Sequence, residues 1–242
     1  MTTDTHAKIQ SRRVGDAVVL GIAKGVGMLE PNMATMLAFF FTDAKIPARQ
    51  LDLVFRRVVE TTFNAVSIDT DTSTSDTAAI IANGEAGPVD INAFESALHD
   101  CALDLVKQIA RDGEGATKLL EVTVSGARDR AQAKRVGKTV VNSPLVKTAI
   151  HGADPNWGRV TMAIGKCESD IDIEPSRVSI WFGEILVYPN LVTADDLSKL
   201  RHYLSGDTIS VRIDLGISEG VFTVYGCDLT EGYVRLNSDY TT

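Results

Sequence analysis

Apolar and polar positions follow helical spacing in several segments of the chain. Residues 48–66 carry apolar side chains three and four positions apart with arginine and glutamate between them, which predicts an amphipathic helix. Residues 92–113 repeat the pattern over a longer stretch that closes at Gly113, in the manner of a helix C-terminus. Shorter helices are predicted around 141–151 and over 194–206.

Short apolar runs between these helices predict strands. The run at 34–44 is continuous, which is typical of a strand covered on both faces. Residues 177–189 predict a hairpin that turns at Phe182-Gly183-Glu184, and the polar stretch 67–77 predicts a loop. The other predicted strands are the start of 16–29, then 77–87, 119–127, 208–217 and 220–229. This alternation indicates a mixed α/β fold and leaves the strand order open.

Length and composition add limits on the class of protein. The 242 residues are 44% hydrophobic and 23% charged, which suits one large domain or two small ones, and no repeat or long linker stands out. The net charge of −8 disfavours a nucleic-acid or anionic-membrane binder. Three cysteines without a CxxC pair suggest buried thiols in a reducing compartment. We find no apolar signal region or membrane span and expect a cytoplasmic protein.

Two local motifs suggest ligand chemistry and are rejected. Gly137-Lys138-Thr139 resembles the end of a phosphate-binding loop, but Gln132 stands where that motif requires glycine. Asp69, Asp71 and Asp76 could gather around a hard cation, yet the glycine and distal glutamate of a calcium loop are missing. A turn held by Asx and Ser/Thr side chains is the favoured interpretation. The four histidines lack zinc-site spacing, so we expect no metal.

Thr35 is the one candidate nucleophile with a local rationale. No GxSxG elbow and no cysteine signature is present. If the chain is cut between Ala34 and Thr35, the freed α-amine lies near the threonine hydroxyl and titrates at about 7.7–8.0 when unperturbed. One residue would then supply nucleophile and base. The ordinary alternative is that Thr35 is a β-branched strand residue, which spacing alone favours.

Longer motifs favour the interpretation of Thr35 as a nucleophile over that of an ordinary strand residue. They are KGVGMLEPNMATMLAFFFTDA, MTTDT, DTSTSDT, DGEGATK, NSPLVKTAIHGADPNWGR and YVRLNSDYTT, in this order except that MTTDT comes first. Together they closely resemble the ornithine acetyltransferase family of the cyclic arginine pathway, across the chain from Thr2 to Thr242. The segments MLEPNMATM and LNSDYTT look most like those of the family branch found beside clavulanic-acid-type biosynthetic genes.

The resemblance implies a particular organisation. Family members cut themselves at the Ala-Thr bond, here Ala34–Thr35, so residues 1–34 would end the α chain and 35–242 would form the β chain. The family fold is a layered α-β-β-α sandwich with N-terminal-nucleophile-like chemistry. The two chains stay intertwined, and two α and two β chains form the usual heterotetramer.

The same resemblance implies the reaction. Thr35 would take the acetyl group of N2-acetyl-L-ornithine, release L-ornithine, and pass the acetyl group to L-glutamate in a ping-pong scheme without metal or cofactor. Acetyl-CoA is a donor for some members. Lys24 would face a substrate carboxylate and Glu114 the ornithine ammonium. The other substrate-binding positions that the motifs imply are Thr2 (with Thr3 nearly as plausible), Asn237 and Thr242.

One departure from the family bears on activity. Only 34 residues precede Thr35, whereas family precursors carry a longer α segment that includes a threonine-glycine oxyanion hole. We expect that the chain is a truncated form and that the upstream segment is its partner. Two alternatives stay open: an N-terminal-nucleophile amidohydrolase or aminopeptidase with water as acceptor, and an inactive fragment that acts only as a subunit. Lys24 and Glu114 argue against a hydrolase, which needs no amino-acid acceptor site.

Overall fold

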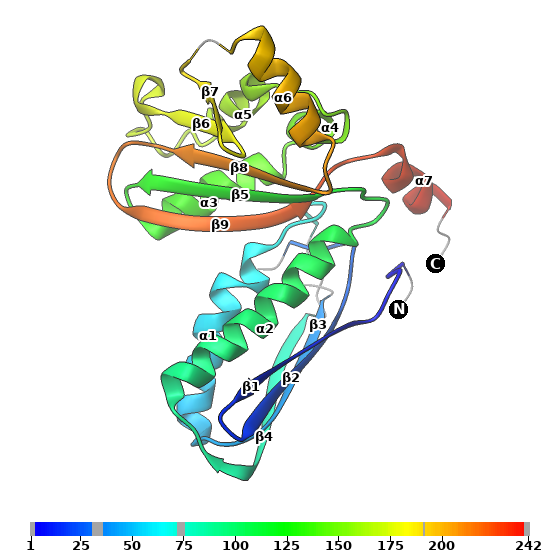
Figure 1. The fold of residues 1–242 in the computed structure, drawn as a ribbon, viewed down its shortest axis with the longest axis vertical. Coiled ribbons are helices and arrows are strands. Elements are labelled where there is room, and N and C mark those ends of the chain that lie inside the picture. Colours follow the sequence, from blue (N-terminus) through cyan, green and yellow to red (C-terminus); the bar gives the residue numbers. More distant parts are fainter. Residues whose placement is uncertain (1–2, 31–35, 72–75, 191, 240–242) are drawn as a thin grey trace. The chain divides into compact units, whose positions relative to one another are not determined.

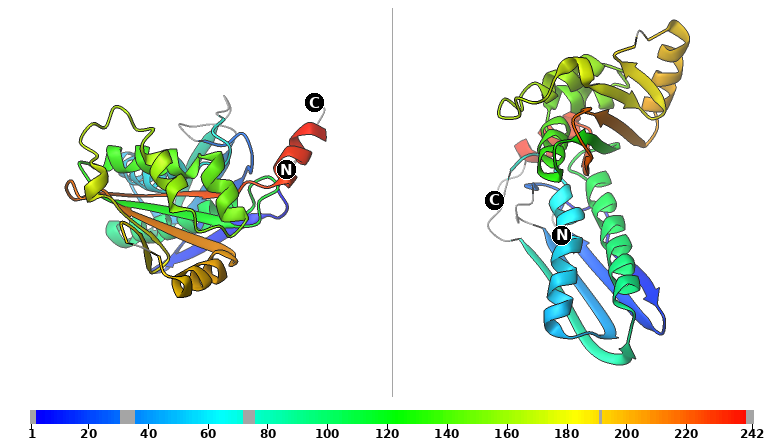
Figure 2. Two further views of the ribbon diagram at one scale, coloured as in Figure 1. Left: turned by 90° about the horizontal axis from the view of Figure 1, so that it is seen from above. Right: turned by 90° about the vertical axis from the view of Figure 1, so that its left-hand side faces the viewer.

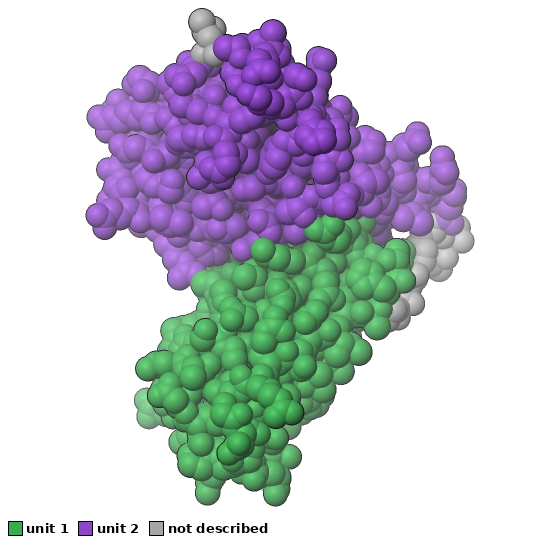
Figure 3. All heavy atoms as spheres, viewed as in Figure 1, with its two compact units in different colours: residues 1–113 green, residues 114–242 purple. Residues whose placement is uncertain are grey.

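The computed structural model describes residues 3–30, 36–71, 76–190 and 192–239. The chain divides into two compact units, residues 1–113 and residues 114–242, shown in different colours in Figure 3. No long linker joins them, in agreement with the sequence. We refer to them as unit 1 and unit 2 and describe each separately.

Unit 1 is a four-stranded sheet with two helices on one face (Figure 1). Its strand order is β1-β2-β3-β4, with β3 and β4 parallel and the other pairs antiparallel. The elements are, in chain order, β1 (Lys8–Val14), β2 (Ala17–Lys24), β3 (Leu37–Lys45), α1 (Ala48–Thr61), the 3-10 turn η1 (Phe63–Ala65), β4 (Thr77–Pro88) and α2 (Ile91–Arg111).

The core of unit 1 lies between the sheet and its helices. Asp90 caps α2 by accepting a hydrogen bond from the Ala93 N–H, and the helix buries its apolar stripe. Phe40 of β3 meets the rings of Phe55 and Phe63 edge-on, at centroid distances of 5.7 and 6.0 Å. The predicted helices at 48–66 and 92–113 are therefore confirmed, each to within a few residues.

The opposite face of this sheet corrects one prediction. Residues 34–44 were expected to form a strand covered on both faces, but side chains alternate along β3 between buried and exposed. Phe39 and Phe41 remain 37% and 39% exposed. Exposed apolar side chains continue across the neighbouring strands at Ile9, Ile22 and Ile81. The open face thus carries a band of apolar side chains, and neither of the two described helices of unit 1 lies on it.

Unit 2 is a five-stranded mixed sheet in the order β7-β6-β8-β5-β9, with only β5 and β8 parallel among its described pairs. Helices α3 to α5 lie on one face and α6 on the other (Figure 2). Its elements are β5 (Leu119–Ala127), α3 (Arg130–Val141), α4 (Pro144–His151), α5 (Trp157–Ile164), the 3-10 turn η2 (Pro175–Arg177), β6 (Ser179–Phe182), β7 (Ile185–Tyr188), α6 (Ala194–Leu204), β8 (Thr208–Asp214), β9 (Gly220–Cys227) and α7 (Glu231–Asp239).

The mixed α/β prediction is confirmed, with four elements that the sequence pattern did not predict: β1, α3, α5 and α7. The Gly137-Lys138-Thr139 stretch lies inside α3, where Gly137 packs against Val224, so its rejection as a phosphate loop is confirmed. Cys101 and Cys227 are buried as expected, Cys167 is half-buried, and none of the three forms a disulfide. Among the described residues, no helix is both long and apolar enough to cross a bilayer.

Candidate functional site

The predicted site residues divide into two groups. Thr2, Ala34, Thr35 and Thr242 lie outside the described residues, so their roles stay predictions. Lys24 belongs to unit 1, while Glu114 and Asn237 belong to unit 2. The surroundings of these three residues define the candidate site within each unit.

Glu114 and Asn237 are brought together although 123 residues separate them. The Asn237 Nδ2 atom donates a hydrogen bond of 2.8 Å to Oε2 of Glu114, and another of 3.0 Å to the Tyr233 carbonyl of its own helix, α7. Glu114 is half-buried in the loop that follows α2. Its carboxylate is therefore held in place by the C-terminal helix and still reachable from solvent, as a group that binds a cationic substrate must be.

A close backbone contact seats α7 against this loop. The Thr230 hydroxyl donates a hydrogen bond of 2.6 Å to the Gly115 carbonyl and accepts one of 2.9 Å from the Gly232 N–H. Gly115 has a φ of +67°, and a Cβ atom there would lie 2.4 Å from the Tyr233 nitrogen. Only glycine fits this conformation and this approach, so the DGEG sequence has a structural reason beside Glu114.

Asp228 anchors the base of the same region. Its buried carboxylate accepts hydrogen bonds from the N–H and hydroxyl of Thr117, from the Lys118 N–H, and from Nδ1 of His151 at 2.9 Å. Burial alone would raise the pKa of Asp228, but these hydrogen bonds hold the pKa below its ordinary value. The carboxylate thus ties the strand β5, the helix α4 and the segment before α7 together.

Lys118, whose backbone N–H binds Asp228, also connects helices α4 and α6 through its side chain. Its buried ammonium group donates to the backbone carbonyls of Ile150, His151 and Leu204, which lie at the C-terminal ends of α4 and α6. Burial lowers the pKa of Lys118, and the charges of Asp228 and Asp207 act in the opposite direction. A cation at helix C-termini satisfies carbonyls that have no partner within their own helix.

In unit 1, two aspartates from the 67–77 loop hold the backbone on either side of residues 31–35. Asp69 accepts hydrogen bonds from the N–H groups of Met28, at 2.7 Å, and Leu29, at 2.9 Å. Asp76 accepts one from the N–H of Met36, the residue after Thr35. These carboxylates bind backbone groups, and no set of three metal-ligating side chains occurs among the residues that the structure describes.

Asp76 is the most perturbed carboxyl group of this region. Its Oδ2 atom is buried and has no hydrogen-bond partner among the described residues. Burial raises the pKa of Asp76 from 3.8 to about 6, although the Met36 hydrogen bond and the charge of Lys24 act to lower it. A carboxyl group with this pKa exchanges its proton near neutral pH, which general acid–base chemistry requires.

Lys24 ends β2 and lies opposite Leu37 of β3, two residues after Thr35 in the chain. Its positive charge contributes to lowering the pKa of both Asp4 and Asp76. Asp4 also accepts a hydrogen bond of 3.0 Å from the N–H of Gly25. The charge of Lys24 thus acts on two carboxyl groups, and its partner in β3, Leu37, lies two residues after the predicted nucleophile in the chain.

A buried ion cluster fixes the N-terminal segment beside β2. The ammonium of Lys8, which is fully buried, contacts Asp4 at 2.8 Å and Asp112 at 2.6 Å. Asp112 in turn accepts hydrogen bonds from the N–H and hydroxyl of Thr5. Burial by itself would raise the pKa of Asp4, but Lys8 and the Gly25 N–H lower it. This cluster holds residues 4–8, which begin two positions after the predicted substrate-binding Thr2, against the end of α2.

Sequence reasoning missed several of these residues. Asp76 was weighed only as a metal ligand, and Asp4, His151 and Asp228 were not singled out. Asp76, His151 and Asp228 have partners 40 to 111 positions away, and Asp4 binds the N–H of Gly25, 21 positions away, so no local pattern marks them. The one available signal was their place within the long motifs DTSTSDT and NSPLVKTAIHGADPNWGR, which contain Asp76 and His151.

The chain is similar to known proteins over its whole length. The model of the ArgJ family matches residues 1–242. Glutamate N-acetyltransferase Oat2 of Streptomyces clavuligerus is 64% identical over 100% of this chain and 63% of its own length. The arginine biosynthesis bifunctional protein ArgJ of Rhodococcoides fascians is 58% identical over 100% of this chain and 60% of its own. The chain therefore spans somewhat less than two thirds of these relatives.

A solved structure extends the likeness to the fold. The crystal structure of the arginine biosynthesis bifunctional protein ArgJ from Bacillus halodurans is similar with a TM-score of 0.79 and 39% sequence identity. The match covers 85% of this chain and 100% of the solved chain. The chain belongs to the ArgJ family.

Proposed function

We propose that this chain is the main part of a self-cleaving glutamate N-acetyltransferase, which moves an acetyl group from N2-acetyl-L-ornithine to L-glutamate. The proposal rests on the hydrogen bond between Glu114 and Asn237. Both residues were predicted to bind the same substrate, and they meet across 123 residues of sequence. The activity that Oat2 of S. clavuligerus is named for supports the same reaction.

The roles of the side chains follow from substrate charge. N2-acetyl-L-ornithine carries a carboxylate and a side-chain ammonium group. Glu114, oriented by Asn237, takes the ammonium, and Lys24 takes a carboxylate. Glutamate has no side-chain ammonium, so Glu114 separates the donor from the acceptor by charge, while Lys24 serves both.

The reaction needs Thr35 as a free N-terminus. The Thr35 hydroxyl first attacks the Ala34 carbonyl, the peptide C–N bond breaks, and water hydrolyses the resulting ester to release the β chain. The Thr35 oxygen then attacks the acetyl carbonyl of the donor. Its proton passes through the α-amine to the leaving ornithine nitrogen as the amide bond breaks. The glutamate amine next attacks the acetyl ester, and the threonine oxygen leaves and regains a proton.

The length of the matched structure supports cleavage at this position. The B. halodurans chain is matched completely and covers 85% of this chain. A β chain of residues 35–242 would hold 208 of the 242 residues, or about 86%. A relative whose crystallised chain has the length of the proposed β chain is what cleavage before this threonine would produce.

The partner is an upstream segment that carries the oxyanion hole, in an assembly of two α and two β chains. The curated relatives are longer than this chain, which covers 63% of Oat2. The open face of the sheet in unit 1, with Phe39, Phe41 and Ile81 exposed, offers an apolar surface to such a segment. Three cysteines without disulfides agree with a cytoplasmic setting.

The test measures cleavage and acetyl transfer separately. The chain is purified alone and after co-expression with the N-terminal segment of Oat2, and each sample is analysed by intact mass and N-terminal sequencing. A fragment that begins at Thr35 supports the nucleophile, and an uncut chain in both samples contradicts it. Thr35→Ala, which removes the hydroxyl, is the control that must stay uncut.

Acetyl transfer is then followed with acetyl-labelled N2-acetylornithine, with and without glutamate. Labelled N-acetylglutamate that forms only with glutamate supports the transferase. Labelled acetate released equally without glutamate supports a hydrolase in its place. Cleavage by the co-expressed sample without either product indicates that the chain serves only as a subunit.

A further inference from the structure

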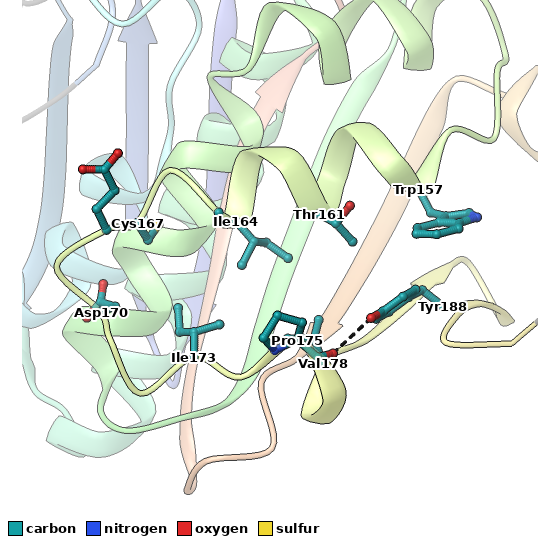
Figure 4. A pocket seen from close by; sticks show the side chains of 11 residues that line it. Trp157, Thr161, Ile164, Cys167, Asp170, Ile173, Pro175, Val178 and Tyr188 are labelled. Carbon is teal, nitrogen blue, oxygen red and sulfur yellow. Dashed lines mark hydrogen bonds between the residues drawn. The ribbon is translucent and has the colours of Figure 1, made fainter.

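Unit 2 contains a pocket that shares no residue with the proposed acetyl-transfer site. It lies between α5, the loop 165–178 and Tyr188 at the end of β7 (Figure 4). Its volume is about 480 Å³, within the range of small-molecule sites, which is about 300–1,000 Å³. Neither Glu114, Asn237 nor any residue of the Asp228 anchor lines it. The pocket therefore needs an explanation of its own.

One end of the pocket is aromatic. The rings of Trp157 and Tyr188 lie with centroids 5.0 Å apart and planes tilted by 33°. The Tyr188 hydroxyl donates a hydrogen bond of 3.1 Å to the Pro175 carbonyl, which fixes the ring at the pocket wall (Figure 4). Such rings bind apolar and planar groups through their faces and also attract cations.

The middle of the pocket is aliphatic. Ile164, Ile173, Pro175 and Val178 line it between the two ends (Figure 4). Ile164 and Val178 are almost fully buried, so this wall is part of the packed unit and preformed. A hydrocarbon chain or ring placed here removes apolar surface from water, which stabilises the complex.

The other end of the pocket is acidic. Asp170 is buried and accepts hydrogen bonds from Arg128, at 3.0 Å, and from Arg135, at 2.6 Å. The hydrogen bond from Arg135 and that from Arg128 lower the pKa of Asp170 against the effect of burial. Its charge is thus already compensated within the protein, and Asp170 serves to hold the loop onto α3.

Glu168 is different, because its charge is not compensated. Its side chain is exposed at the pocket's end, and within the described part of the chain it has no hydrogen bond or ion pair. No lysine, arginine or histidine lines the pocket, and Lys166 of the same loop is not among the lining residues. An aromatic wall and an uncompensated carboxylate both attract positive charge.

We propose that this pocket binds an organic cation with an apolar body. An ammonium or guanidinium group would pair with Glu168, the hydrocarbon part would lie along Ile164 and Val178, and its far end would contact Trp157 and Tyr188. Anionic ligands are disfavoured, since they would meet Glu168 without a balancing cation. The site goes beyond the acetyl transfer proposed above and does not depend on it.

The test compares three probes of one shape and different charge. The purified chain is titrated with 4-phenylbutylamine, 4-phenylbutanol and 4-phenylbutyrate at physiological salt, by calorimetry and by tryptophan fluorescence. Only Trp157 and Trp181 contribute to the fluorescence. We expect the amine to bind at least about tenfold more tightly than the carboxylate, a difference of about 1.4 kcal/mol. Trp157→Phe should abolish the fluorescence change while calorimetric binding persists.

A matched pair of variants tests whether the charge of Glu168 causes the preference for the amine. Glu168→Gln, at an exposed position that the fold does not need, should reduce the preference for the amine to about threefold or less. Glu219→Gln removes another exposed carboxylate of unit 2, outside the pocket, and should leave the preference unchanged. Equal affinity for all three probes, an unchanged preference in Glu168→Gln, or no saturable binding below about 10 mM would overturn the proposal.

Discussion

The carboxylate of Asp76 accepts a hydrogen bond from the backbone N–H of Met36, the residue that follows the predicted nucleophile Thr35. Asp69, seven positions earlier, holds the N–H groups of Met28 and Leu29. Two carboxylates of one loop therefore fix the backbone before and after residues 31–35. Asp76 also has one buried oxygen without a hydrogen-bond partner in the described part of the chain, and burial raises its pKa to about 6. Such a group can take up or release a proton under physiological conditions.

This raised pKa predicts a pH-dependent stability. A carboxyl group with a higher pKa in the folded state binds more protons there than in the unfolded chain, so its contribution is present below about pH 4 and is lost as pH rises through about 6. Asp76→Asn removes the titration. Relative to the variant, the original chain should lose about 1 kcal/mol of unfolding free energy between about pH 4 and 6, after allowance for solvent screening.

Urea denaturation at several pH values measures this difference. Asp16→Asn is the control, because Asp16 is an exposed aspartate of the same unit. Subtracting the variant's curve from that of the original chain cancels the opposite trend from carboxylates with lowered pKa values, such as Asp4 and Asp228. Parallel curves for Asp76→Asn and the original chain would show that Asp76 titrates at its ordinary pKa.

The ion cluster around Lys8 makes a second prediction. Lys8→Met keeps the length of the side chain but leaves the carboxylates of Asp4 and Asp112 buried without their ammonium partner. Loss of one partner of a buried pair costs about 3–5 kcal/mol, so the unfolding free energy of unit 1 should fall by this amount. Adding Asp112→Asn to Lys8→Met should restore part of the loss, because one uncompensated charge is removed.

The matched control for this cluster is Lys199→Met. Lys199 also contacts an aspartate, Asp195 at 2.5 Å, but both side chains are exposed. Because solvent screens such a pair, its loss should change stability far less than Lys8→Met does. Similar losses in the two variants would indicate that burial of the Lys8 cluster does not determine its contribution.

The two helices of unit 1 could be predicted because their apolar residues recur at helical spacing over 14 or more positions. α3 could not, since its arginine and lysine residues conceal a buried face of Ala133, Val136 and Val140. The open face of β3 was misjudged for another reason. A continuous apolar run is typical of a strand with two covered faces, whereas Phe39 and Phe41 remain exposed in this chain.

The candidate site, too, could be predicted from the sequence only in part. Glu114 and Asn237 were named from the family resemblance, because neither periodicity nor spacing connects positions 123 residues apart. Asp76 could have been found only by knowing that β4 pairs with β3, which brings the Asp76 carboxylate beside the N–H of Met36. The pocket at Trp157 and Tyr188 likewise depends on the packing of α5 against the end of β7. Chemistry that assembles across strands needs the tertiary structure.

Glu114→Gln tests the proposed substrate contact while its surroundings are preserved. Glutamine retains an oxygen that can accept the Asn237 hydrogen bond, but it carries no charge for the ornithine ammonium. A hydrogen bond to a charged group contributes about 1.5–3 kcal/mol, so kcat/KM for N2-acetylornithine should fall by about tenfold to a hundredfold. Self-cleavage, measured by intact mass, should stay complete. Unchanged kinetics in a fully cleaved sample would remove Glu114 from the site.

The close contact between Gly115 and helix α7 leads to the last prediction. Gly115→Ala places a Cβ atom 2.4 Å from the Tyr233 nitrogen, at a φ of +67°, so α7 should detach and hydrogen exchange over residues 231–239 should accelerate. Gly15→Ala provides the control, because Gly15 has a φ of +59° but nothing within 4 Å of a Cβ atom. Both variants carry the backbone strain of about 1–2 kcal/mol, and only Gly115→Ala adds the steric conflict. Faster exchange of α7 in Gly115→Ala alone would show that this contact holds Asn237 beside Glu114, whereas unchanged exchange would exclude it.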